Sequence, residues 1–137
     1  MPHPSAKPVE KVLNVDDDEH VRVYLEHALK TLGIQEICHA KNGWEAIAEY
    51  FTQQPDLVLL DINMPELSGP EALREMRKMF PEVRAVMITS EATHKRVREA
   101  IRIGAKGFIR KDIATEQLLH MLANYIDPAK ATPYAST

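Results

Sequence analysis

Residues 55–65 of the chain read Pro-Asp-Leu-Val-Leu-Leu-Asp-Ile-Asn-Met-Pro. The apolar run from Leu57 to Leu60 shows no alternation between apolar and polar positions, which is typical of a strand that is covered on both faces. Strands of this kind occur in parallel sheets that carry helices on both sides. The stretch therefore predicts a central strand of an α/β sheet, with the carboxylate of Asp61 near its carboxyl end.

The sequence on either side repeats this pattern, because short runs rich in Val, Ile and Leu alternate with longer segments of helical period. Gly33 and Gly104 are placed to end helices, and Asn42 and Ser68 are placed to cap them. Strict alternation predicts the α/β class, with a five-stranded, doubly wound parallel sheet and five helices. The expected strands are residues 11–15, 35–40, 57–62, 83–89 and 107–109, and the expected helices are residues 19–32, 43–51, 69–79, 94–103 and 115–126.

The 137 residues are enough for one domain, which we expect to span residues 10–127. Residues 1–9 and 128–137 are rich in Pro, Ser and Thr, and we expect both segments to be disordered. The longest apolar run is far shorter than a membrane span, and the first residues lack the apolar region of a signal peptide. We therefore expect no membrane contact and a cytoplasmic location. Cys38 is the only cysteine, which excludes an intramolecular disulfide and a multi-thiolate zinc site.

Polar side chains follow four of the expected strands. Asp16 and Asp17 come directly after the first strand, and Asp61 lies near the end of the third. Carboxylates that converge without a partner repel one another, and a hard divalent cation such as Mg²⁺ relieves this repulsion. Thr89 and Lys111 follow the fourth and fifth strands. A hydroxyl and an ammonium group that face a metal-carboxylate cluster form a site for an oxyanion, and a phosphoryl group fits best.

These residues occur in the order Val-Asp-Asp at 15–17, Asp-Ile-Asn-Met-Pro at 61–65, Ile-Thr-Ser at 88–90 and Gly-Phe-Ile-Arg-Lys at 107–111. The combination resembles the receiver domain of two-component response regulators, in particular the single-domain chemotaxis type, over residues 10–127. The resemblance implies a flavodoxin-like fold with strand order 2-1-3-4-5. It also implies that Asp61 accepts a phosphoryl group from a histidine kinase or a histidine phosphotransfer protein.

The resemblance also assigns roles around Asp61. Asp17, Asp61 and the main-chain carbonyl of Asn63 would hold Mg²⁺, with Mn²⁺ as a substitute, and Asp16 would act largely through a bound water. Lys111 would offset charge on the phosphoryl oxygens, while Thr89 and Phe108 would move on phosphorylation. Asn63 and Glu91 occupy the positions that tune phosphoryl lifetime, and this pair resembles faster-decaying receivers. Because the acceptor is regenerated by self-dephosphorylation, the resemblance implies a switch rather than an enzyme in the usual sense.

Two features depart from the usual receiver pattern. Lys111 is followed by Asp112 and not by proline, a form familiar in receivers fused to NarL/LuxR-type DNA-binding domains. We expect a stand-alone receiver. One alternative is the receiver portion of such a longer regulator, and the other is a Mg²⁺-dependent phosphohydrolase that uses Asp61 as nucleophile. The phosphohydrolase is disfavoured because its general acid would lie at position 63, which is Asn. The other departure is Asn14, a polar residue in an apolar strand that needs a buried partner.

Positive charge is concentrated between residues 94 and 111, which carry a net charge of +6 although the whole chain carries −3. This segment forms part of the surface through which receivers usually meet partners, formed by the fourth helix, the fifth strand and the fifth helix. We expect a downstream protein with an acidic surface to bind there. A homodimer formed on phosphorylation stays open, and nucleic acid is disfavoured because no DNA- or RNA-binding motif accompanies the charge. The residues expected on this face are Lys95, Arg96, Arg98, Arg102 and Lys106.

Overall fold

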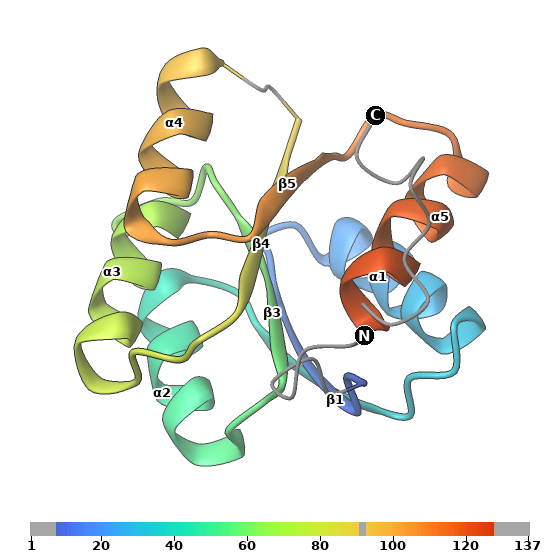
Figure 1. Cartoon of the computed structure of the whole chain (residues 1–137), viewed down its shortest axis with the longest axis horizontal. Coiled ribbons are helices and arrows are strands. Elements are labelled where there is room, and N and C mark those ends of the chain that lie inside the picture. The colour runs from blue at the N-terminus through green and yellow to red at the C-terminus, as the bar shows by residue number, and fades with distance from the viewer. Residues whose placement is uncertain (1–7, 91–92, 128–137) are drawn as a thin grey trace, which may run out of the picture.

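The structure is a computed structural model that describes residues 8–90 and 93–127. Neighbouring strands are all parallel, and their order across the sheet is β2-β1-β3-β4-β5 (Figure 1). This confirms the predicted doubly wound, flavodoxin-like topology, and the expected element boundaries differ from the observed ones by at most two residues. The elements in chain order are β1 (Lys11–Val15), α1 (Glu19–Thr31), β2 (Glu36–Ala40), α2 (Gly43–Gln53), β3 (Leu57–Asp61), α3 (Gly69–Met79), β4 (Ala85–Thr89), α4 (His94–Ile103), β5 (Gly107–Arg110) and α5 (Thr115–Ile126).

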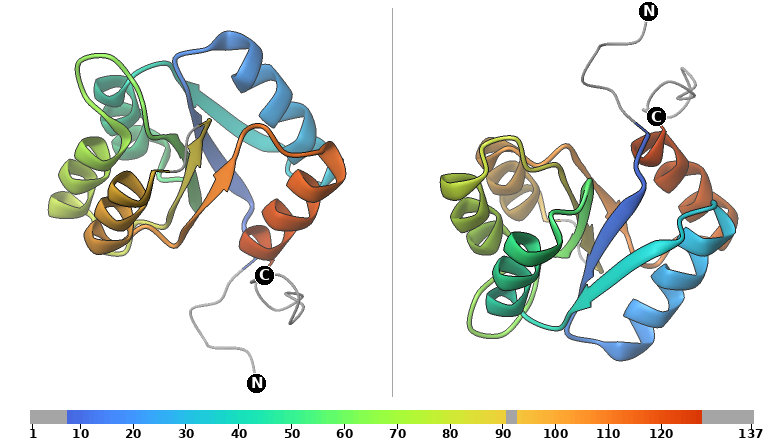
Figure 2. Two further views of the ribbon diagram at one scale, coloured as in Figure 1. Left: turned by 90° about the horizontal axis from the view of Figure 1, so that it is seen from above. Right: turned by 90° about the horizontal axis from the view of Figure 1, so that it is seen from below.

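Helices cover both faces of the sheet: α1 and α5 lie on one face, and α2, α3 and α4 lie on the other (Figures 1 and 2). The central strand β3 contributes to both resulting cores. Leu57 and Leu59 belong to the cluster under α1 and α5, whereas Val58 and Leu60 belong to the cluster under α2 and α3. This explains why the run is apolar without alternation, since successive side chains of a strand point to opposite faces.

Val9, just before β1, packs against the end of α5. Val9 is only 5% exposed, and its N–H donates to the carbonyl of Ile126 at 2.8 Å. The expected domain bounds of residues 10–127 stay a prediction. The other residues expected to be disordered, apart from Pro8, lie outside the described residues.

Local signals fix the helix that follows β3. Ser68 caps α3 in a capping box with Glu71, as the sequence predicts for that position. Gly69, the first residue of α3, lies so close to β3 that a Cβ atom there would overlap the carbonyl oxygen of Asp61. Glycine thus allows α3 to start directly beside the end of β3. Among the described residues, no helix is both long enough and apolar enough to cross a lipid bilayer.

Candidate functional site

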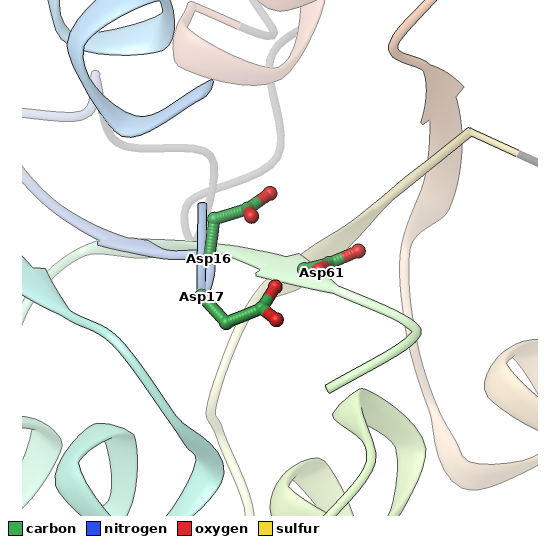
Figure 3. Close-up of side chains that lie close together, drawn as sticks. All are labelled: Asp16, Asp17 and Asp61. Carbon is green, nitrogen blue, oxygen red and sulfur yellow. The ribbon is translucent and has the colours of Figure 1, made fainter. Parts of the chain in front are cut away.

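Three carboxylates meet at the carboxyl edge of the sheet, as the sequence predicts. Asp16 and Asp17 follow β1, and Asp61 is the last residue of the adjacent strand β3. One oxygen from each of the three side chains lies within 4.8 Å of the others, and the side chains point into the same space (Figure 3). Asp16 is 0% exposed and Asp61 is 2% exposed, whereas Asp17 is open to solvent. Two of the three carboxylates have therefore lost most of their hydration.

Lys111 is the basic residue that forms ion pairs with the carboxylates of this cluster among the described residues. Its Nζ lies 2.8 Å from Oδ2 of Asp16 and 3.1 Å from Oδ1 of Asp61. The N–H of Lys111 donates to the carbonyl of Thr89 at 2.8 Å, which extends the β4–β5 pairing and fixes where the side chain starts. Both contacts are ion pairs, and Oδ2 of Asp16 is buried without a hydrogen-bond partner in the part of the chain that the structure describes.

The electrostatics of the cluster are unbalanced in the absence of a cation. Burial and the negative charges of Asp16 and Asp17 raise the pKa of Asp61 to about 7, although Lys111 acts in the opposite direction. Burial alone would lower the pKa of Lys111, but the two buried carboxylates outweigh burial and raise it. One ammonium group thus compensates only part of the charge of three carboxylates.

The residues present fit a magnesium ion. Mg²⁺ prefers a few carboxylate or carbonyl oxygens and keeps several of its waters, which suits a cluster that is buried on one side and open at Asp17. Oδ2 of Asp16, which has no hydrogen-bond partner among the described residues, and the raised pKa of Asp61 are the features that a cation would correct. Asp16, Asp17 and Asp61 each offer one carboxylate oxygen to such an ion.

The raised pKa of Asp61 predicts that the stability of the metal-free protein depends on pH. Because the folded state raises the pKa of Asp61 above its unfolded value, stability is greatest in acid and is lost as the pH rises through about 7. We expect a loss of up to about 4 kcal/mol between about pH 4 and pH 8. Urea unfolding with a chelator measures it, and Mg²⁺ should restore most of the loss at the higher pH. An equal loss in Asp61→Asn would show that other groups cause the dependence.

The structure also places the remaining predicted site residues. Thr89 is the fully buried last residue of β4 and follows Ile88, the register partner of Asp61 in β3. Phe108 in β5 is half-buried and packs against the core under α2 and α3, while Asn63 is exposed in the loop after β3. These three predicted roles stay predictions. Glu91 lies outside the described residues.

Arg22 is a site residue that the sequence does not reveal. Its guanidinium donates to the main-chain carbonyl of Asp16 at 2.6 Å, and its own carbonyl accepts a hydrogen bond of 2.9 Å from the amide of Asn14. The amide nitrogen of Asn14 thus has a partner that the sequence could not name, whereas Oδ1 of Asn14 is buried without a hydrogen-bond partner among the described residues. Together Arg22 and Asn14 tie α1 to the end of β1. No sequence signal could have found Arg22, because an arginine in the first turns of a helix is usually solvated.

The basic residues of α4 do not share one surface. Lys95, Arg98 and Arg102 line a groove of about 490 Å³ together with Arg74 of α3. Arg96 and Lys106 are exposed but do not line this groove. No residue of β5 or α5 lines this groove, and three of the five residues expected on the partner face border α3. The predicted partner face of α4, β5 and α5 stays a prediction.

A model of the response regulator receiver domain matches residues 12–123 of the chain. The chain belongs to this receiver family. The chemotaxis protein CheY of Bacillus subtilis is 33% identical over 112 residues, which are 82% of this chain and 93% of that protein. The structure of Vibrio cholerae chemotaxis protein CheY4 is similar with a TM-score of 0.77 at 30% identity, and the match covers 85% of this receiver and 98% of that chain. The response regulator VraR of Staphylococcus aureus is 34% identical over 109 residues, which are 79% of this receiver and 52% of that protein.

Membership of the receiver family indicates the general function of the carboxylate cluster. Receiver domains accept a phosphoryl group, bind Mg²⁺ at an acidic pocket and interact with histidine kinases and downstream targets. This receiver has such a pocket at Asp16, Asp17 and Asp61.

Proposed function

We propose that this receiver is a phosphorylation switch whose acceptor is Asp61. The observation that carries the proposal is the buried Asp61 carboxylate beside Asp16, with Nζ of Lys111 at 3.1 Å. A carboxylate oxygen of Asp61 attacks the phosphorus of a phosphohistidine in a kinase or phosphotransfer protein. The new P–O bond forms as the P–N bond breaks, and the released imidazole takes a proton.

The neighbours of Asp61 support this chemistry. An ionised Asp61 is needed for attack, and its raised pKa means that the metal-free site holds this carboxylate partly protonated near neutral pH. Mg²⁺, when bound to Asp17, Asp61 and the Asn63 carbonyl, supplies positive charge that favours the ionised form. Lys111 faces the same carboxylate and offsets the negative charge of the incoming phosphoryl oxygens.

The output of the switch is a change in partner binding. Thr89 hydrogen-bonds the new aspartyl phosphate. Phe108, in the strand beyond β4 as seen from Asp61, then moves inward behind Thr89. Moving a two-state equilibrium from 1:99 to 99:1 takes about 5.5 kcal/mol, which sets the scale of differential binding that phosphorylation must supply. The downstream partner presents an acidic surface to the basic side chains of α4.

We infer that the chain works in the cytoplasm as a CheY-like receiver, without an attached output domain. The match to Bacillus subtilis CheY over 93% of that protein's length supports this form. The match to VraR, which covers 52% of that protein, supports the alternative of a receiver joined to a further domain. A phosphohydrolase role has less support, because Asn63 occupies the place of its general acid.

The lifetime of the phosphoryl group is set by Asn63 and Glu91 in this proposal, and we expect the fast decay of chemotaxis-type receivers. The half-life of the phosphorylated protein at neutral pH measures this directly. Decay over many hours would contradict the assignment but would leave Asp61 as acceptor.

The proposed function is tested by incubation with Mg²⁺ and acetyl phosphate, followed by intact mass spectrometry. One phosphoryl group per chain is the expected result, and its formation should require the metal. The proposal would be contradicted if no adduct formed at saturating acetyl phosphate in a protein whose circular dichroism spectrum shows that it is folded.

A further inference from the structure

The groove between α3 and α4 differs from the phosphorylation site in both place and chemistry. Its lining contains four basic side chains and one acid, Glu99, together with the apolar Ile103. The residues that line it are Arg74, Lys95, Arg98, Glu99, Arg102 and Ile103. No carboxylate of the cluster at the sheet edge takes part. The groove is therefore a separate candidate binding surface.

The four basic side chains are available to a ligand. Arg74, Lys95, Arg98 and Arg102 are exposed, and none of them forms an ion pair within 4 Å among the described residues. Some other surface cations are paired, as Lys78 is with Glu75 at 2.8 Å and Arg110 is with Asp112 at 2.8 Å, whereas the exposed Arg96 and Lys106 form no ion pair within 4 Å among the described residues. Four unpaired cations along one groove repel one another, and a ligand with negative charge would relieve this repulsion.

The cations form a row with a defined spacing. Lys95, Arg98 and Arg102 stand at positions i, i+3 and i+7 of α4, so they lie along one side of the helix over about 10 Å. Arg74 faces them from α3. This length matches two turns of a helix, and carboxylates one turn apart on a bound segment would meet successive cations.

The walls of the groove are held together at one end. The guanidinium of Arg77 in α3 lies over Gly104, where a Cβ atom would stand 2.8 Å from Cζ of Arg77, and it donates to the carbonyl of Val83 at 3.3 Å. Gly104 has φ of +118°, which favours glycine independently. Arg77 is thus a positioning residue that keeps α3 and the end of α4 in contact.

We propose that this groove binds an acidic helical segment of a partner protein, with its carboxylates facing Arg74, Arg98 and Arg102. This proposal places the acidic partner of the phosphorylation switch between α3 and α4. It rests on the proposed phosphorylation switch only for its biological role. Two observations favour a peptide over nucleic acid. Glu99 lies among the cations and would repel a continuous polyanion, and no aromatic side chain of the groove is available for base stacking.

The test measures binding of a fluorescein-labelled helical peptide of about 14 residues that carries Glu once per turn on an Ala and Gln background. We expect saturable binding at low salt that weakens as salt rises. Arg98→Glu and Arg74→Glu should each weaken binding of the peptide about tenfold or more. Lys106→Glu is the control, because Lys106 is exposed outside the groove and the change of charge is the same. This variant should weaken binding less than about twofold. Glu99→Gln should tighten binding about threefold.

Several results would overturn the proposal. These are no binding by the folded protein at low salt, equal losses in Lys106→Glu and Arg98→Glu, or tighter binding of a single-stranded oligonucleotide with the same dependence on Arg98. Thermal unfolding of each variant identifies any loss of fold, and amide chemical shifts induced by the peptide should cluster on α3 and α4. Asp61→Asn should bind the peptide like the native chain, so a failure of the groove and a failure of phosphoryl transfer would be told apart.

Discussion

Asp61→Asn is expected to abolish phosphorylation by acetyl phosphate in the presence of Mg²⁺. The amide oxygen is a far weaker nucleophile than a carboxylate, and the change is nearly isosteric, so the buried site keeps its packing. Intact mass spectrometry should show one phosphoryl adduct in the native chain and none above background in the variant. Because the substitution also removes a carboxylate with a raised pKa, the variant should be no less stable than the native protein at neutral pH.

A matched variant makes this result specific. Asp56→Asn removes a carboxylate just before β3, where Asp56 accepts hydrogen bonds from the N–H groups of Glu10 and Lys11 at 2.9 Å, far along the strand from Asp61. It should incorporate the phosphoryl group normally. An adduct of equal size in Asp61→Asn would mean that another residue accepts the group, and peptide mapping would identify that residue.

Lys111→Met is expected to slow phosphorylation about a hundredfold or more, because loss of one preorganised charged donor typically has an effect of this size. The Nζ group that it removes stands 2.8 Å from Asp16 and 3.1 Å from Asp61, while methionine retains an apolar stem of similar length. The initial rate of adduct formation from acetyl phosphate, measured at saturating Mg²⁺, gives the effect. High Mg²⁺ should recover stability but not rate, since the ion compensates the carboxylates without replacing the ammonium.

The adjacent residue provides the control for Lys111. Arg110 is exposed and holds Asp112 through two contacts, Nε to Oδ1 at 2.9 Å and Nη2 to Oδ2 at 2.8 Å. Arg110→Met removes the same charge from the same strand end and should leave the rate within about twofold, because an exposed ion pair contributes little. Equal slowing of phosphorylation in both variants would indicate a general effect of charge and would contradict a specific role of Lys111 in phosphoryl transfer.

Much of the fold could be predicted because its signals are local. The unalternating run in β3, the caps at Asn42 and Ser68 and the glycine stop at Gly104 each act within a few residues, and each appears in the structure as expected. The convergence of Asp16, Asp17 and Asp61 could also be predicted, because parallel strands bring their carboxyl ends to one edge of the sheet. Local patterns therefore predict the α/β class, the doubly wound parallel sheet and the meeting of the carboxylates, while the strand order follows from the resemblance to receiver domains.

The side chains that complete the site, and the surface that the basic helix presents, follow from packing in three dimensions. The contacts of Arg22 with Asp16 and Asn14, and of Gly69 with Asp61, depend on the approach of a helix to a strand end, which no spacing in the chain encodes. The basic residues of α4 form one charged segment in the sequence, yet three of them turn toward α3 and join Arg74. The physical reason is that side-chain direction on a helix is fixed by its rotation against the sheet, and that rotation is set by packing of Ala100 and its neighbours into the core.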